Sequence, residues 1–70
     1  MKNNYEVQVY NAEVREALKN GNIHQDLEDK WSDTHYIAVR ASSPEEAKIV
    51  CQRRHPEKLG FILGDVVEVY

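Results

Sequence analysis

The three histidines and the single cysteine come first, because imidazole and thiolate groups bind metals and take part in catalysis. His24, His35, His55 and Cys51 stand apart in the sequence, and none belongs to a C-x-x-C or H-x-x-x-H pair. Scattered ligands of this kind do not match the spacings of zinc sites. We therefore expect no metal and no cofactor, and we interpret Cys51 as a small core residue rather than a nucleophile.

The acidic residues give no sign of a catalytic pair. Asp26, Glu28 and Asp29 lie in a polar stretch that is typical of a solvated face. Carboxylates that act as acid and base need surroundings that shift their pKa values apart. The three glycines are too far apart to form a phosphate-binding loop. The sequence therefore predicts a protein that is not an enzyme.

Tyrosine and arginine side chains gather on one face of the predicted sheet. Because successive side chains of a strand point to opposite faces, Tyr10, Tyr36, Arg40 and Tyr70 are expected on the outward side of three strands. Tyrosine and arginine are enriched in protein interfaces. Aromatic residues on an open sheet face also stack nucleobases in single-strand binders. We single out these four residues as candidates for interaction.

Arg53 and Arg54 belong to the only basic cluster of the chain. The cluster comprises Lys48, Gln52, Arg53, Arg54, His55 and Lys58. A functional interpretation is contact with phosphate or with an acidic partner. The simpler interpretation, which we favour, is compensation of the negative end of a helix dipole.

Composition and charge favour one small folded domain over residues 1–70. The net charge is −3, with 41% hydrophobic and 30% charged residues, and the sequence has no apolar run of membrane-spanning length. The N-terminal residues lack the apolar core of a secretory signal, and one cysteine cannot form an internal disulfide, so we expect a cytoplasmic location without membrane contact. A core this small gives limited stability, which favours dimerisation or docking on another protein.

The clearest local signal is a helix over residues 44–54. Ser43 stands at the N-cap, Pro44 at the first helical position, and Glu46 where it can complete a capping box. Ala47, Val50 and Cys51 are expected to face the core, and Pro56 prevents an easy continuation.

A helical insertion is predicted over residues 12–31. Asn11 can cap a first helix in which Ala12, Ala17 and Leu18 share one side and Val14 lies off it, and residues 20–22 (Asn-Gly-Asn) end it. A second helix follows from the spacing of four between Ile23, Leu27 and Trp31. This insertion either covers the Tyr/Arg sheet face or leaves it open for a partner.

The predicted fold is a small α+β domain with a three-stranded sheet. Strands are expected at residues 5–10, 35–41 and 66–70. The first strand pairs antiparallel with one of the others, and the last two, joined through the 44–54 helix, are parallel. The inward residues are Val7, Val9, Ile37, Val39, Val67 and Val69. Gly64 and Asp65 form a bulge inside one long strand or a turn between two short ones.

The segments YEVQVY, ASSPEEAKIV and GDVVEVY resemble several small β-α-β families, including the DpnD/PcfM-type proteins of mobile elements and the accessory B subunits of some oxygenases. The resemblance covers mainly residues 36–51 and implies no functional residue. Small, acidic domains without motifs are common among phage and mobile-element accessory proteins, which favours such an origin. Overall, the sequence predicts an adaptor, inhibitor or accessory domain that dimerises or docks on a partner protein. A nucleic-acid-binding module and an accessory subunit of an enzyme are the alternatives.

Overall fold

The structure is a computed structural model that describes residues 2–24 and 27–70. Its three strands are β1 (Asn3–Asn11), β2 (His35–Ala41) and β3 (Phe61–Val69), and its two α-helices are α1 (Ala12–Lys19) and α2 (Pro44–Arg54). Two short 3-10 helices are η1 (Asp29–Ser32), before β2, and η2 (Glu57–Leu59), before β3. Within the described ranges, every helix is too short or too polar to cross a lipid bilayer.

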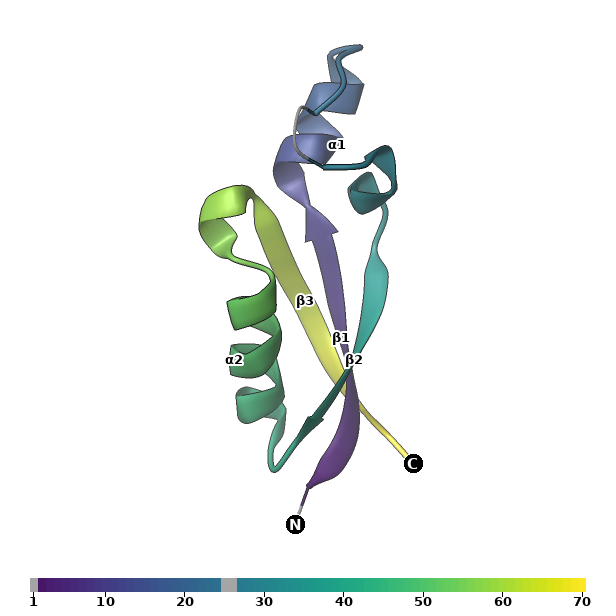
Figure 1. Ribbon diagram of the computed structural model, residues 1–70. Helices are drawn as coiled ribbons and strands as arrows, with labels where there is room; N and C mark the ends of the chain where they lie inside the picture. The colour runs from purple at the N-terminus through teal and green to yellow at the C-terminus, as the bar shows by residue number, and fades with distance from the viewer. Residues whose placement is uncertain (1, 25–26) are drawn as a thin grey trace.

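The strands form one antiparallel sheet in the order β2-β1-β3, with α2 along one face (Figure 1). The central strand β1 runs antiparallel to both neighbours. The outer strands are therefore parallel to each other, and α2 is the crossover between them. The predicted α+β fold, with the 44–54 helix on one face of a three-stranded sheet, is confirmed.

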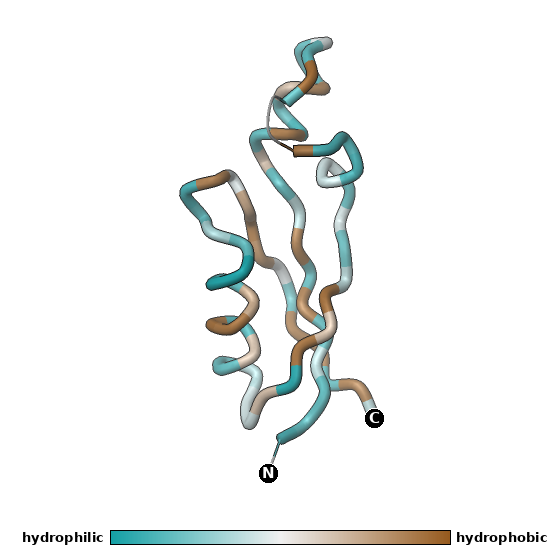
Figure 2. The backbone as a smooth tube through the Cα atoms, in the orientation of Figure 1, coloured by the Kyte–Doolittle hydropathy of each residue, from teal (hydrophilic) through white to brown (hydrophobic). Residues whose placement is uncertain are grey.

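The core lies between the sheet and α2. Val7 and Val9 of β1 are fully buried and belong to a cluster with residues of β2, β3, α2 and η1. Hydrophobic residues recur along all three strands (Figure 2). The other buried members of this cluster are Tyr5, Val39, Ala41, Ala47, Cys51 and Phe61. The valine alternation predicted for the first two strands is therefore confirmed.

The side-chain order predicted for the last strand is wrong. Val67 and Val69 are 54% and 40% exposed, whereas Val66 packs against the core. The cause is a bulge: Val9 pairs with Leu63 and Val7 with Val66, so two residues, Gly64 and Asp65, stand opposite one residue of β1. The extra residue shifts the alternation by one position. Of the two alternatives considered for Gly64 and Asp65, the structure has the bulge within one long strand.

The capping residues predicted for both helices are confirmed. Asn11 accepts a 2.9 Å hydrogen bond from the backbone N–H of Val14, and Ser43 accepts one of 3.1 Å from Glu46. The Glu46 carboxylate does not accept the hydrogen bond from the backbone N–H of Ser43 that would complete the predicted capping box. It accepts a 2.5 Å hydrogen bond from the Ser42 hydroxyl instead.

The prediction for the 12–31 insertion is wrong in two respects. Val14, expected off the buried side of α1, is fully buried. The helix predicted from Ile23 to Trp31 is absent from the described part of that range, which holds only η1; Gln25 and Asp26 lie outside the described residues.

Of the two alternatives left open for the second sheet face, the described residues of the insertion leave that face uncovered. Leu27 and Trp31 pack against the α2-side core, and Ile23 is 77% exposed. The α1 helix continues beyond the end of the sheet (Figure 1). A spacing of four suits a helical stripe, but here Leu27 and Trp31 pack against the core with only a bend and η1 between them, and Ile23 is exposed.

Candidate interaction surface

The sheet face away from α2, which we call the open face, has no helix over it in the described chain. The register places outward side chains on all three strands. They are Asn4, Glu6, Gln8 and Tyr10 on β1, Tyr36, Ala38 and Arg40 on β2, and Ile62, Val67 and Val69 on β3. Eight of these ten are exposed, and Gln8 and Tyr10 are partly buried.

Aliphatic residues line the β3 side of the open face. Val67 and Val69 lie on one side of the bulge, and Ile62, 37% exposed, lies on the other. Tyr36, on the opposite edge strand, is 61% exposed. An antiparallel sheet with one face in water normally carries polar side chains there. This face instead leaves several large apolar side chains without cover.

Two opposite charges lie close together on the open face, Glu6 on the central strand β1 and Arg40 near the end of the edge strand β2. Ala38 pairs with Glu6 and Arg40 pairs with Asn4, so Glu6 and Arg40 lie on neighbouring strands, one outward position apart. An open depression of about 390 Å³ lies between them and Val69. Among the described residues, neither charge takes part in an ion pair or side-chain hydrogen bond of its own chain.

The predicted tyrosines do not form one group. Tyr36 and Arg40 are both exposed on β2 of the open face. Tyr10 is partly buried at the far end of that face, where the Arg15 guanidinium carbon lies 3.8 Å from the centre of its ring. Tyr70 follows the end of β3 and is fully exposed, so it is not a member of the sheet face.

Gln8 completes the open face beside the bulge. Its side-chain oxygen accepts a 3.3 Å hydrogen bond from the backbone N–H of Asp65. A Cβ on Gly64 would lie 2.9 Å from the same oxygen, so the glycine leaves room for Gln8. The sequence signal for this arrangement was the Gly-Asp pair inside an apolar run.

Arg53 and Arg54 are not brought together with the tyrosines. They are exposed in the last turn of α2, which lies on the opposite side of the sheet. Their position near the carboxyl end of a helix agrees with dipole compensation. Lys48 and Gln52, from the same cluster, line a second depression of about 190 Å³ between α2 and β3.

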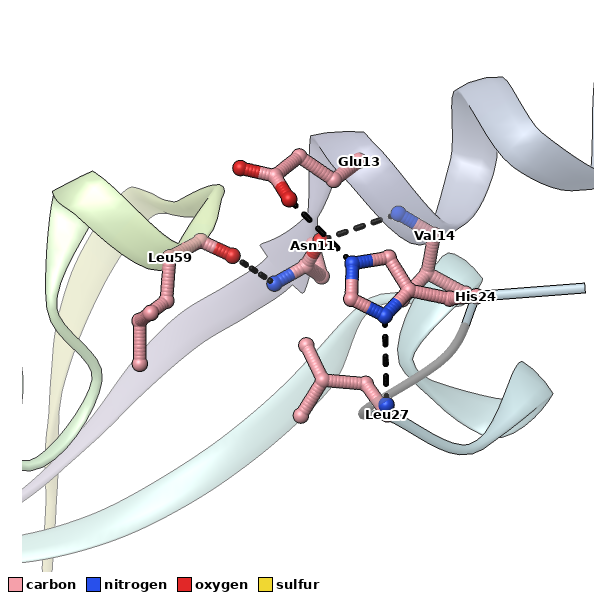
Figure 3. Close-up of polar contacts among 6 residues, drawn as sticks. All are labelled: Asn11, Glu13, Val14, His24, Leu27 and Leu59. Carbon is pink, nitrogen blue, oxygen red and sulfur yellow. Dashed lines mark hydrogen bonds and ion pairs between the residues drawn. The ribbon is translucent and has the colours of Figure 1, made fainter.

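A polar junction fixes the end of β1 against the start of β3 (Figure 3). Fully buried Asn11 donates a 3.0 Å hydrogen bond to the carbonyl of Leu59 while it caps α1. The His24 ring lies between Glu13 and Leu27, with Nε2 3.2 Å from a Glu13 carboxylate oxygen and Nδ1 accepting a 3.2 Å hydrogen bond from the N–H of Leu27 (Figure 3). We interpret this junction as structural, because its hydrogen bonds join the start of α1 to η2, to His24 and, through His24, to Leu27.

The remaining histidines surround Trp31. His35 and His55 lie 4.7 Å and 5.7 Å from its ring centre, and each donates to a backbone carbonyl, of Lys30 and Cys51 respectively. Cys51 is fully buried, and this burial raises the pKa of its thiol. Within residues 2–24 and 27–70, no three potential metal ligands among His, Cys, Asp and Glu lie together.

Comparison of the chain with protein-family models, with curated proteins and with solved structures found no match. The functional argument therefore depends on the surface described above.

Proposed function

We propose that this chain is a small non-enzymatic interaction domain that works as a homodimer, joined through the open face. The observation that carries the proposal is the uncovered group of Tyr36, Ile62, Val67 and Val69 on one side of the sheet. Burial of apolar surface is the main favourable contribution to most protein associations. A second copy is the occupant to which we commit.

The dimensions of the chain support an association. Its radius of gyration is 13.1 Å, against about 11 Å for a compact domain of this length. Its accessible surface is 4997 Å², against about 4500 Å² for a monomer of 8.1 kDa. A standard interface removes about 800 Å² from each partner. The chain therefore exposes about 500 Å² more than a compact monomer of its mass, which is less than one standard interface but is in the direction expected of a chain that associates.

A cytoplasmic location belongs to the same proposal. The single thiol is buried in the core, where it serves packing and has no second cysteine for an internal disulfide. Such use of cysteine is usual in a reducing compartment.

The nucleic-acid alternative has weaker support. Stacking of bases needs free aromatic faces next to positive charge. Arg15 lies over the ring of Tyr10, and the open face itself carries the acidic Glu6 beside Arg40. Arg53 and Arg54 are on the other side of the sheet.

Sedimentation equilibrium at micromolar concentrations tests the proposal. We expect a mass near twice 8.1 kDa, and we expect Val67→Ser to shift the equilibrium toward monomer. Ile49→Ser is the matched control, because Ile49 is also 54% exposed but lies on α2. A protein that stays monomeric at high concentration, or a labelled oligonucleotide that binds in a salt-dependent way, would contradict the proposal.

A further inference from the structure

The open face carries its charges in a pattern that fits a copy of itself. A two-fold interface brings the same patch of both subunits together, so each charge must meet its opposite on the other subunit. The open face offers Glu6 on the central strand and Arg40 on the edge strand β2, with Val67 and Val69 on the other edge strand, β3. Both charges are exposed, and neither is used in an ion pair within the described chain.

We propose, on the basis of the homodimer above, that two reciprocal Glu6–Arg40 ion pairs set the register of that dimer. The two-fold axis would run across the strands, midway between the row of Ala38, Glu6 and Val67 and the row of Arg40, Asn4 and Val69. This axis exchanges the two rows between the copies.

The exchange of rows brings opposite charges together and places valine against valine. Val67 then lies over the partner's Val69, and Arg40 lies next to the strand that carries the partner's Glu6. Stacked sheets are about 10 Å apart, a distance that an arginine and a glutamate side chain together can bridge. The depression of about 390 Å³ beside Arg40 gives the guanidinium room to turn toward the partner.

The same charges disfavour the neighbouring register. An axis that passes through the row of Glu6 would place Glu6 over the partner's Glu6, and like charges at close range oppose association. An axis through the row of Arg40 would bring the two arginines into a similar conflict. The ion pairs therefore select one arrangement from several that the valines alone would allow.

Charge exchange tests this inference on the full chain by sedimentation equilibrium. We expect Glu6→Arg and Arg40→Glu each to weaken association about tenfold or more, because each places like charges together at two symmetric positions. The double variant should recover most of the wild-type association. Glu16→Arg, on α1 away from the sheet face, is the control and should leave association unchanged.

The outcomes separate the two proposals. A wild-type monomer would overturn the homodimer itself. A wild-type dimer that tolerates both single substitutions, or a double variant as weak as the single ones, would overturn the ion-pair register alone. Circular dichroism checks that each variant is folded. Glu6→Gln and Arg40→Gln provide milder versions, which should weaken association without introducing repulsion.

Discussion

The ring of Trp31 meets the ring of Phe61 edge-on, with the two centroids 5.2 Å apart. The contact joins η1, at the end of the long connection after α1, to the first residue of β3. His55 of the α2 C-cap lies beside both rings, 5.7 Å and 5.3 Å away. Aromatic pairs in this geometry contribute beyond the area that they bury. The cluster is therefore what holds the connection on the α2 side of the sheet.

Replacement of Trp31 by alanine should lower the free energy of unfolding by about 2 kcal/mol, since a partly buried aromatic is lost from the edge of the core. Urea denaturation measures the change. Ile23→Ala is the control: the two residues belong to one stripe by spacing, but Ile23 is 77% exposed and its loss should cost less than about 0.5 kcal/mol. An equal loss of unfolding free energy in the two variants would contradict the finding that Trp31 packs at the core while Ile23 is exposed.

The amide of Asn11 should be among the most sensitive polar groups. Asn11→Ala removes the cap of α1 and leaves the Leu59 carbonyl without its donor. The free energy of unfolding should therefore fall by about 2 kcal/mol. Denaturant unfolding reports the loss. Asn22→Ala, at an exposed position after α1, should be nearly neutral, and a neutral Asn11→Ala would show that the junction is not important for stability.

Two glycines with positive φ should respond differently to alanine. Gly21, with φ +75°, has no atom within 4 Å of an added Cβ, so Gly21→Ala should cost about 1 kcal/mol of backbone strain. Gly60, with φ +94°, would place a Cβ 2.7 Å from Glu13 Cγ and 2.8 Å from Asn11 Oδ1. Gly60→Ala should therefore cost at least about 2 kcal/mol. Thermal unfolding of both variants checks the order, and the reverse order would refute it.

The Ser42 hydroxyl, which donates to the Glu46 carboxylate, holds the pKa of that carboxyl below its usual range. Because the folded state favours the ionised form, the stabilisation is present above the ordinary pKa and is lost as the pH falls through the lowered value. The destabilisation caused by Ser42→Ala should therefore disappear in acid. Ser43→Ala removes a cap on a backbone N–H instead, so its cost should persist. Unfolding curves at neutral and acidic pH compare the two.

Cys51 should react slowly with thiol reagents in the folded protein. It is fully buried, and burial raises the pKa of its thiol, so little thiolate forms near neutral pH. Labelling in urea should be fast, and labelling in buffer should follow the rate of opening. Rapid labelling of the native protein would mean that α2 does not seal the core.

The parts of the fold that local chemistry specifies were predictable from the sequence. Ser43 and Pro44 define the start of α2, and alternating Val7 and Val9 define the buried side of β1, because each signal lies within a few residues. The side-chain order of the last strand was not predictable, because strict alternation fails where Gly64 and Asp65 stand opposite one residue of β1. Whether a residue pair is a bulge depends on the neighbouring strand.

The candidate surface was predicted only in part, for the same reason. Tyr36 and Arg40 were assigned to the open face correctly, since β2 alternates without interruption. Val67 and Val69, which carry the apolar part of that face, had been assigned to the core. Nothing in the spacing of Leu27 and Trp31 distinguishes a helix from an irregular segment that brings both side chains to the core.

The bulge in β3 has one more consequence, which concerns aggregation. A bulge twists the outer margin of a sheet, so a straight foreign strand fits poorly along β3. The other edge strand, β2, pairs in a regular register from His35 to Ala41 and contains no proline. Uncontrolled growth of the sheet, at high concentration or on partial unfolding, should therefore begin at β2.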